Sequence, residues 1–278
     1  MAVVVLAVVS ALVWVTSGRA ISPLSAVPGL SAAPADTPAA PPAPAFPYPG
    51  PDGPPLPLRP DGYGQVLPTP AALVDRRLPT VDLLPPPEDG RFDARITPLT
   101  PEELADSTWH PGCPVPAERL RLLTMSFWGF DDRGHTGRMV VRDDVADGVV
   151  GVFARLFAAR FPIEQMRPVT PADLTAVPNG QGNNTAAFAC RRATGQSRFS
   201  AHALGLAIDV NPFQNPLVRR DGLVIPELAS AYTDRSRVRP GMLRDGDVAV
   251  DAFTALGWTW GARFRAPVDT MHFSRTGD

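Results

Sequence analysis

Two histidines with carboxylates close by in the sequence are the residues best suited to chemistry. His202 precedes Asp209 by seven positions, and His272 follows Asp269 by three. Imidazole nitrogens and carboxylate oxygens are common ligands of Zn²⁺, and three protein ligands leave the fourth tetrahedral position to water. A metal held in this way would activate water for hydrolysis. The pattern therefore indicates a hydrolytic zinc site.

The surroundings of Asp209 favour the same hypothesis. Asp209 lies in the apolar segment 206–210 (LAIDV), where a bare carboxylate is costly and a metal ion would compensate its charge. Seven positions along a straight strand place His202 and Asp209 on opposite faces, so Gly205 is expected to turn the chain between them. Two interpretations without metal stay open: hydrogen-bonded histidines in the core, and an Asp209 that organises the turn at Asn211-Pro212.

The elements that must position these residues begin after about Thr97. Alternating apolar residues predict strands over 122–130 and 137–142, and helical spacing predicts a helix from an Asp144 N-cap to about Arg160. The same criteria predict a helix over residues 247–256 and short strands over residues 186–192, 206–210, 258–260 and 270–273. Strands and helices mix without regular βαβ alternation, which indicates an α+β fold.

Two ordered motifs carry a family resemblance. Residues 200–209 fit S-x-H-x-x-G-x-A-x-D, and residues 269–273 fit an acid-x-x-His-Phe motif. Together they resemble the zinc D-alanyl-D-alanine carboxypeptidase-like family. That family includes peptidoglycan carboxypeptidases, D-alanyl-D-alanine dipeptidases of vancomycin resistance and L-alanyl-D-glutamate endopeptidases. Shorter stretches extend the resemblance over about Trp109 to Ser274.

The resemblance implies a Zn²⁺ ion bound by the side chains of His202, Asp209 and His272. Asp269 is the implied general base and acid. The implied fold is a small antiparallel sheet flanked by helices, with the zinc site on the sheet, as in the Hedgehog signalling domain. The implied activity is zinc-dependent hydrolysis of peptide bonds in peptidoglycan stem peptides, by a carboxypeptidase or an endopeptidase.

The resemblance also implies residues that bind substrate. Arg191 would hold carbonyl or carboxylate oxygens, with its neighbour Arg192 as the second candidate, and Ser200 would hydrogen-bond substrate near the metal. His135 follows a turn and is expected in a surface loop, with the wall of the groove as the alternative.

A peptidoglycan-binding or structural module that keeps the fold without turnover is the alternative function. Such a module would be expected to have lost a ligand or the base. The three ligand positions and Asp269 are all filled as the family pattern requires, so the sequence favours the enzyme.

The two cysteines, Cys113 and Cys190, are expected to form a disulfide. In an exported protein an even pair of cysteines is more often bridged than free. The alternative is a pair of buried thiols. No C-x-x-C occurs in the sequence, which excludes a thiolate zinc ribbon.

Export is indicated by the beginning of the chain. The apolar run over residues 2–15 is too short to span a bilayer as a helix and is typical of a secretory signal. Residues 1–20 are therefore predicted to be a signal peptide or an N-terminal anchor, with a buried core helix as the third interpretation. Of the 34 prolines, 20 fall in residues 21–90, so residues 21–96 are predicted to form a largely disordered linker. Residues 97–278 are the expected catalytic domain.

Composition excludes several other classes. All 26 basic residues are arginine, and without lysine the chain is not a P-loop NTPase, a Schiff-base enzyme or a protein kinase. With a net charge of −2 the chain has no excess of positive charge to neutralise phosphates, which argues against nucleic acid as a partner. We expect a secreted or cell-wall associated monomer whose partners are peptidoglycan peptides, with membrane contact only through an N-terminal anchor.

Overall fold

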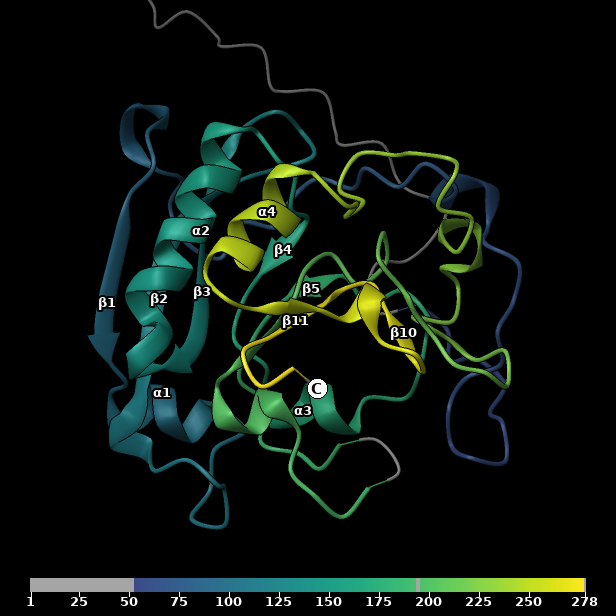
Figure 1. Ribbon diagram of the computed structural model, residues 1–278, viewed down its shortest axis with the longest axis horizontal. Helices are drawn as coiled ribbons and strands as arrows, with labels where there is room; N and C mark the ends of the chain where they lie inside the picture. The colour runs from purple at the N-terminus through teal and green to yellow at the C-terminus, as the bar shows by residue number, and fades with distance from the viewer. Residues whose placement is uncertain (1–52, 194–195, 278) are drawn as a thin grey trace, which may run out of the picture. The chain divides into compact units, whose positions relative to one another are not determined.

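The structure, a computed structural model, describes residues 53–193 and 196–277 (Figure 1). The predicted signal or anchor, residues 1–20, and the first part of the predicted linker, residues 21–52, lie outside these residues. No helix in the described ranges has the length and apolar character needed to cross a membrane. The mixture of helices with small antiparallel sheets confirms the α+β class.

The first sheet has the strand order β1-β2-β3, and several of its buried residues belong to the main core cluster. Its strands are β1 (Ala94–Pro98), β2 (Leu120–Trp128) and β3 (Gly134–Arg142). β2 and β3 make the predicted hairpin, with Leu120 opposite Arg142. Helix α2 (Ala146–Ala158) lies across this sheet in Figure 1, and its apolar face joins the sheet in one core cluster. The predicted apolar positions are all buried: Val145, Val149, Val152, Phe153, Leu156 and Phe157.

The start of α2 differs from the prediction. The predicted cap, Asp144, belongs to a 3-10 turn over Asp143–Val145, and no side chain caps α2 itself. The Asp144 carboxylate instead accepts from Arg142 at 2.6 Å and from Arg275 at 2.8 Å. Since two guanidinium groups hold this carboxylate, Asp144 ties the end of β3 to the C-terminal end of the chain.

The second sheet, of order β6-β11-β9, carries the residues of the predicted metal site. Its strands are β6 (Ala207–Asp209), β11 (His272–Ser274) and β9 (Thr259–Trp260). Helix α4 (Val248–Ala255) lies within the predicted range 247–256 and is capped by Asp247, which accepts from the Val250 N–H. Phe253 of α4 stacks on Phe273 of β11 with ring centroids 4.1 Å apart. This packing fixes the sheet against the core.

The remaining elements are short. The third sheet is β10 (Val268–Asp269), β7 (Leu217–Val218) and β8 (Val224–Ile225), in that order, and β4 (Gln165–Met166) pairs in parallel with β5 (Asn184–Thr185). Helices α1 and α3 span Pro101–Asp106 and Pro171–Thr175. The 3-10 turns are Ala71–Leu73, Glu88–Gly90, Ala117–Arg119, Asp143–Val145, Ala201–Leu204, Ser230–Tyr232 and Gly261–Arg263. The single small sheet that the resemblance implied is therefore divided into several.

The strand predicted over residues 186–192 is wrong, because its backbone groups bond to several different elements. Ala186 bridges Asp209, the Phe188 N–H donates to Val140, and the Ala189 N–H donates to His202. This segment therefore connects the first sheet to the predicted metal site.

Residues 53–96 differ from the predicted disordered linker, because a few buried side chains bind this segment to the rest of the chain. Leu56 and Leu73 are buried in a second core cluster with Phe213. Arg76 donates to both carboxylate oxygens of Glu164, at 2.7 and 2.6 Å. The two side chains are only 3% and 11% exposed. A high proline content does not reveal such isolated contacts.

Replacing Arg76 with alanine should destabilise the protein by about 3–5 kcal/mol, because it leaves the Glu164 charge buried without its partner. The matched control is Arg77→Ala. Arg77 pairs with Asp75, but these side chains are 54% and 61% exposed. That variant should lose less than about 1 kcal/mol. Urea unfolding of the full-length chain measures both values, and equal values would contradict the role given to Arg76.

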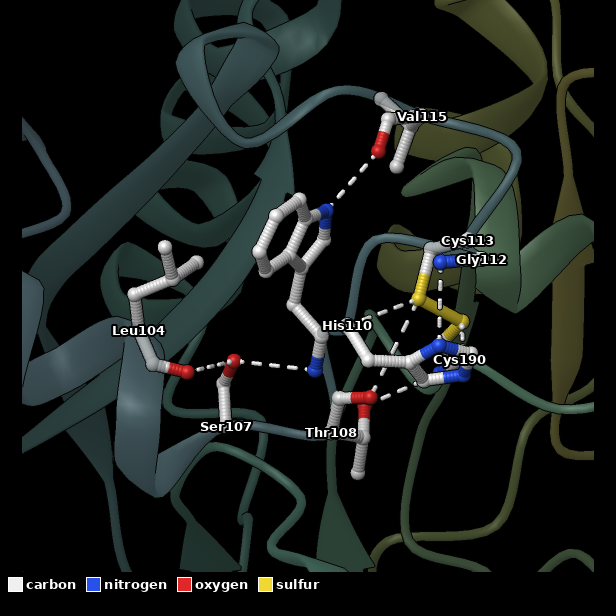
Figure 2. Close-up of a disulfide and its surroundings, with 9 residues drawn as sticks. Leu104, Ser107, Thr108, His110, Gly112, Cys113, Val115 and Cys190 are labelled. Atoms are coloured by element: carbon white, nitrogen blue, oxygen red, sulfur yellow. Dashed lines mark hydrogen bonds between the residues drawn. A yellow bond between two sulfur atoms is a disulfide. The ribbon is translucent and has the colours of Figure 1, made fainter.

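The predicted disulfide between Cys113 and Cys190 is confirmed, and Figure 2 shows its surroundings. It joins the loop after α1 to the segment that follows β5, across 77 positions in the sequence, and no described cysteine is free.

Reducing the disulfide should lower the melting temperature by several degrees. A closed loop of 77 residues restricts the unfolded chain by an amount worth about 4 kcal/mol in the chain-entropy model. Calorimetry with and without a reductant measures the shift. Two reactive thiols in the unfolded, unreduced protein would refute the bridge.

Candidate metal centre

The structure brings the three residues predicted as metal ligands together. Asp209 and His272 lie opposite each other in the β6–β11 pair, and His202 lies in the 3-10 turn before β6. His272 Nδ1 is 3.0 Å from Asp209 Oδ1, and His202 Nε2 is 3.2 Å from Asp209 Oδ2. The two imidazole nitrogens are 3.2 Å apart. One ligand atom from each residue therefore lies within 4.8 Å of the other two.

Gly205 makes this convergence possible. It ends the 3-10 turn with a φ of +66°, in the left-handed region that favours glycine. A Cβ atom at this position would lie 2.6 Å from the backbone nitrogen of Arg142. Both the turn angle and the close approach exclude larger residues. The chain therefore turns at Gly205 between His202 and Asp209, as expected from the sequence.

His202 presents one ring nitrogen to the site because the other is bound to the backbone. Its Nδ1 is 2.6 Å from the carbonyl oxygen of Ala187, so Nδ1–H donates that hydrogen bond. The neutral ring then has its lone pair on Nε2, the atom that faces Asp209 and His272. Metal-binding histidines are commonly oriented in this way by a second hydrogen bond.

The Asp209 carboxylate is held in its charged form. Burial acts to raise its pKa, but the charges and hydrogen bonds of His202 and His272 outweigh burial and hold the pKa well below its usual range. The side chain is 23% exposed. An ionised carboxylate beside two imidazoles is the donor set that Zn²⁺ accepts.

Asp269 lies at the end of β10, three positions before His272. Its Oδ1 is buried and accepts no hydrogen bond within residues 53–193 and 196–277. Burial and, second, the charge of Asp209 raise the pKa of Asp269 to about 7, while His272 and Arg191 act in the opposite direction. A pKa near neutrality suits a group that takes up and returns a proton.

These residues fit a zinc ion. The trio offers two imidazole nitrogens and a carboxylate, which leaves a fourth tetrahedral position open. The bare Oδ1 of Asp269 is a buried acceptor without a donor, and a water molecule held beside the metal would supply one. The donor types and the buried acceptor thus agree with a catalytic rather than a structural zinc site.

The loop that carries Asp269 and His272 is fixed by contacts that were not predicted. The indole Nε1–H of Trp260 donates to the Thr270 carbonyl at 2.9 Å. At Gly261, a Cβ atom would lie 2.4 Å from the Asp269 carbonyl oxygen, so only glycine fits there. A glycine directly after the aromatic strand is the one sequence signal that could have indicated this close approach.

The predicted substrate residues have different surroundings. Arg191 is exposed, and its charge acts to lower the pKa of the Asp269 carboxyl. Arg192 stacks over the ring of Phe199 at 4.3 Å and donates to the Ser197 carbonyl. The Ser200 hydroxyl is buried and accepts from the His202 N–H. Ser200 therefore orients the turn of His202, and its contact with substrate stays a prediction.

The prediction of a surface-loop position for His135 is wrong. His135 lies buried in β3, and its ring nitrogens are each 2.8 Å from a carboxylate oxygen, of Asp82 and of Asp131. Asp82 belongs to the segment predicted to be disordered, so its contact with His135 could not be expected from the sequence. Both ring nitrogens are engaged, which leaves His135 no role as a base.

A second group of possible ligands is formed by His110, Cys113 and Cys190. Both sulfur atoms are joined in the disulfide, so neither is the thiolate that a metal needs. The trio of His202, Asp209 and His272 is therefore the better candidate.

Residues 194–275 match the model of a protein family described as D-alanyl-D-alanine carboxypeptidase. The matched stretch contains all three proposed ligands and Asp269. The match confirms the predicted resemblance to this zinc peptidase family and supports a peptidase at the level of the family. No curated protein and no solved structure is significantly similar to the chain.

Proposed function

We propose that this chain is an exported zinc metallopeptidase that hydrolyses peptide bonds in peptidoglycan stem peptides. The observation that carries the proposal is the convergence of His202, Asp209 and His272 beside a buried carboxyl, Asp269, with a bare oxygen. A binding module would need neither the open ligand position nor a proton acceptor next to it.

The metal would be held by His202 Nε2, His272 Nδ1 and the Asp209 carboxylate. A bound Zn²⁺ supplies a Lewis acid that lowers the pKa of a water molecule from about 15.7 to about 7 and polarises a carbonyl. The Ala187 carbonyl keeps the His202 ring in the required tautomer. The chain therefore orients its ligands before the metal binds.

Asp269 would act as the general base and acid. Its carboxylate takes a proton from the attacking water and returns it to the leaving amine. A positioned group in this role is typically worth about 10²- to 10⁴-fold in rate. The raised pKa of Asp269 makes both transfers feasible near neutral pH.

Arg191 would bind the substrate beside the metal. Its guanidinium is exposed and close enough to Asp269 to influence it electrostatically. A guanidinium offers a planar fork of donors to a carboxylate or to a developing oxyanion. Stem peptides of peptidoglycan carry free carboxylates and D-residues, so they match this combination of zinc and arginine.

The export signal indicated by residues 2–15 supports a secreted or cell-wall associated location. In that location the partners of the chain are peptidoglycan peptides, and a monomer is sufficient for the site described.

Incubation of the full-length chain with muropeptides tests the proposal. Mass spectrometry should identify shortened peptides in the presence of zinc and intact peptides in the presence of a chelator. Release of D-alanine identifies a carboxypeptidase, and cleavage between L-alanine and D-glutamate identifies an endopeptidase. Intact peptides retained by a zinc-loaded chain would instead support the binding module.

A further inference from the structure

The disulfide lies beside a histidine that the proposed mechanism does not use (Figure 2). His110 Nε2 is 3.6 Å from the sulfur of Cys190. The Gly112 N–H donates to His110 Nδ1 at 3.1 Å. Because Nδ1 accepts, the neutral ring carries its proton on Nε2, the atom that faces the sulfur. His110 is therefore oriented to donate to a thiolate at Cys190.

The two sulfur atoms differ in how solvent reaches them and in their partners. Cys190 is only 7% exposed, whereas Cys113 is partly exposed in the loop after Trp109. A thiolate arriving from solvent therefore meets Cys113 first. The Thr108 carbonyl lies 4.0 Å from the sulfur of Cys113, where it can accept from a thiol at that position. The backbone N–H of His110 also donates to the sulfur of Cys113, at 3.1 Å. The assignment of Cys190 as the leaving group therefore rests on solvent access and on the imidazole beside it.

We propose that Cys113–Cys190 is a thiol-exchange site with His110 as the group that stabilises the leaving thiolate. The thiolate of an external dithiol attacks Cys113 Sγ, the bond between the two sulfurs breaks, and Cys190 leaves as a thiolate that accepts from His110 Nε2–H. The second thiol of the dithiol then attacks the mixed disulfide. That step releases Cys113 as a thiol and leaves the dithiol oxidised.

Opening of the bridge should act on the proposed substrate arginine, and this part rests on the proposed function. Arg191 directly follows Cys190, and the Ser200 N–H donates to its carbonyl. A bridge between Arg192 and Phe199 closes the loop between these positions. The disulfide and the turn of His202 thus hold the two ends of one loop. Without the disulfide, Arg191 loses one of these restraints.

Exchange kinetics of the full-length chain test the site without relying on peptidase activity. His110→Ala should slow reduction by dithiothreitol about threefold or more, because a poorer leaving thiolate departs more slowly. The control is Thr108→Val, which removes the Thr108 Oγ1 that accepts from the Cys190 N–H at 2.9 Å but keeps the imidazole. It should not slow the reaction. Equal rates in wild type and His110→Ala would overturn the proposal.

Trapping with glutathione identifies the sulfur that is attacked. Peptide mass spectrometry should find glutathione on Cys113. Glutathione on Cys190 would overturn the assignment of the leaving group.

The effect on Arg191 is measured with Cys113→Ser/Cys190→Ser, which avoids a reductant that removes zinc. KM for a muropeptide should rise about threefold or more with little change in kcat. In an Arg191→Ala background the two cysteine substitutions should cause no further rise in KM. If the double variant does not fold, the wild-type chain carrying glutathione on Cys113 replaces it. An unchanged KM would overturn the coupling to Arg191. Absence of turnover in wild type would refute the proposed function and leave the exchange assay decisive for the thiol site.

Discussion

Replacing Asp269 with asparagine should reduce turnover about 10²-fold or more and leave zinc content and fold close to those of wild type. Asparagine keeps the size of the side chain and removes the proton acceptor. The metal should stay because His202, Asp209 and His272 converge without Asp269. Turnover on muropeptides and the zinc content of the same preparation provide the two measurements.

The dependence on pH separates a base from a merely structural acid. Asp269 must be ionised to accept a proton, so wild-type turnover should fall as the pH is lowered through its pKa. The activity that remains in Asp269→Asn should lack this acidic limb. Asp269→Glu should recover part of the turnover. Full turnover in Asp269→Asn would move the base elsewhere, and loss of zinc would make Asp269 a ligand.

Replacing His272 with alanine should remove zinc and turnover together. His272 Nδ1 contacts both Asp209 and His202, so its loss leaves two ligands, fewer than the three of a catalytic zinc site. The matched control is His110→Ala, which removes an exposed imidazole outside the trio. The control should keep one zinc per chain and normal turnover. A His272→Ala variant that kept its zinc would contradict the ligand set.

The sequence predicted that His202, Asp209 and His272 come together, but it did not predict most of the elements around them. The difference lies in how many residues each pattern spans. The apolar face of α2 and the position of helix α4 follow from local spacing. The two histidine motifs are ordered and close to the turns that bring them together. In contrast, β7 and β10 have two residues each, which is too short for a periodic pattern. The antiparallel neighbour that positions Asp269 was therefore not predicted.

Contacts between distant parts of the chain were also not predicted. Glu164 pairs with Arg76 across 88 positions, and His135 with Asp82 across 53. Arg76 and Asp82 lie in a segment whose proline content resembles that of a disordered chain. Composition averages over many residues, whereas each of these contacts depends on one side chain. A few side-chain contacts therefore order a segment whose composition is typical of a linker.

Zinc analysis of the full-length chain, purified without added metal and then titrated, tests the proposed metal centre most directly. Elemental analysis should find one zinc per chain, because His202, Asp209 and His272 supply the three protein ligands of one site. No stoichiometric zinc in the purified chain, and none taken up on titration, would contradict the account.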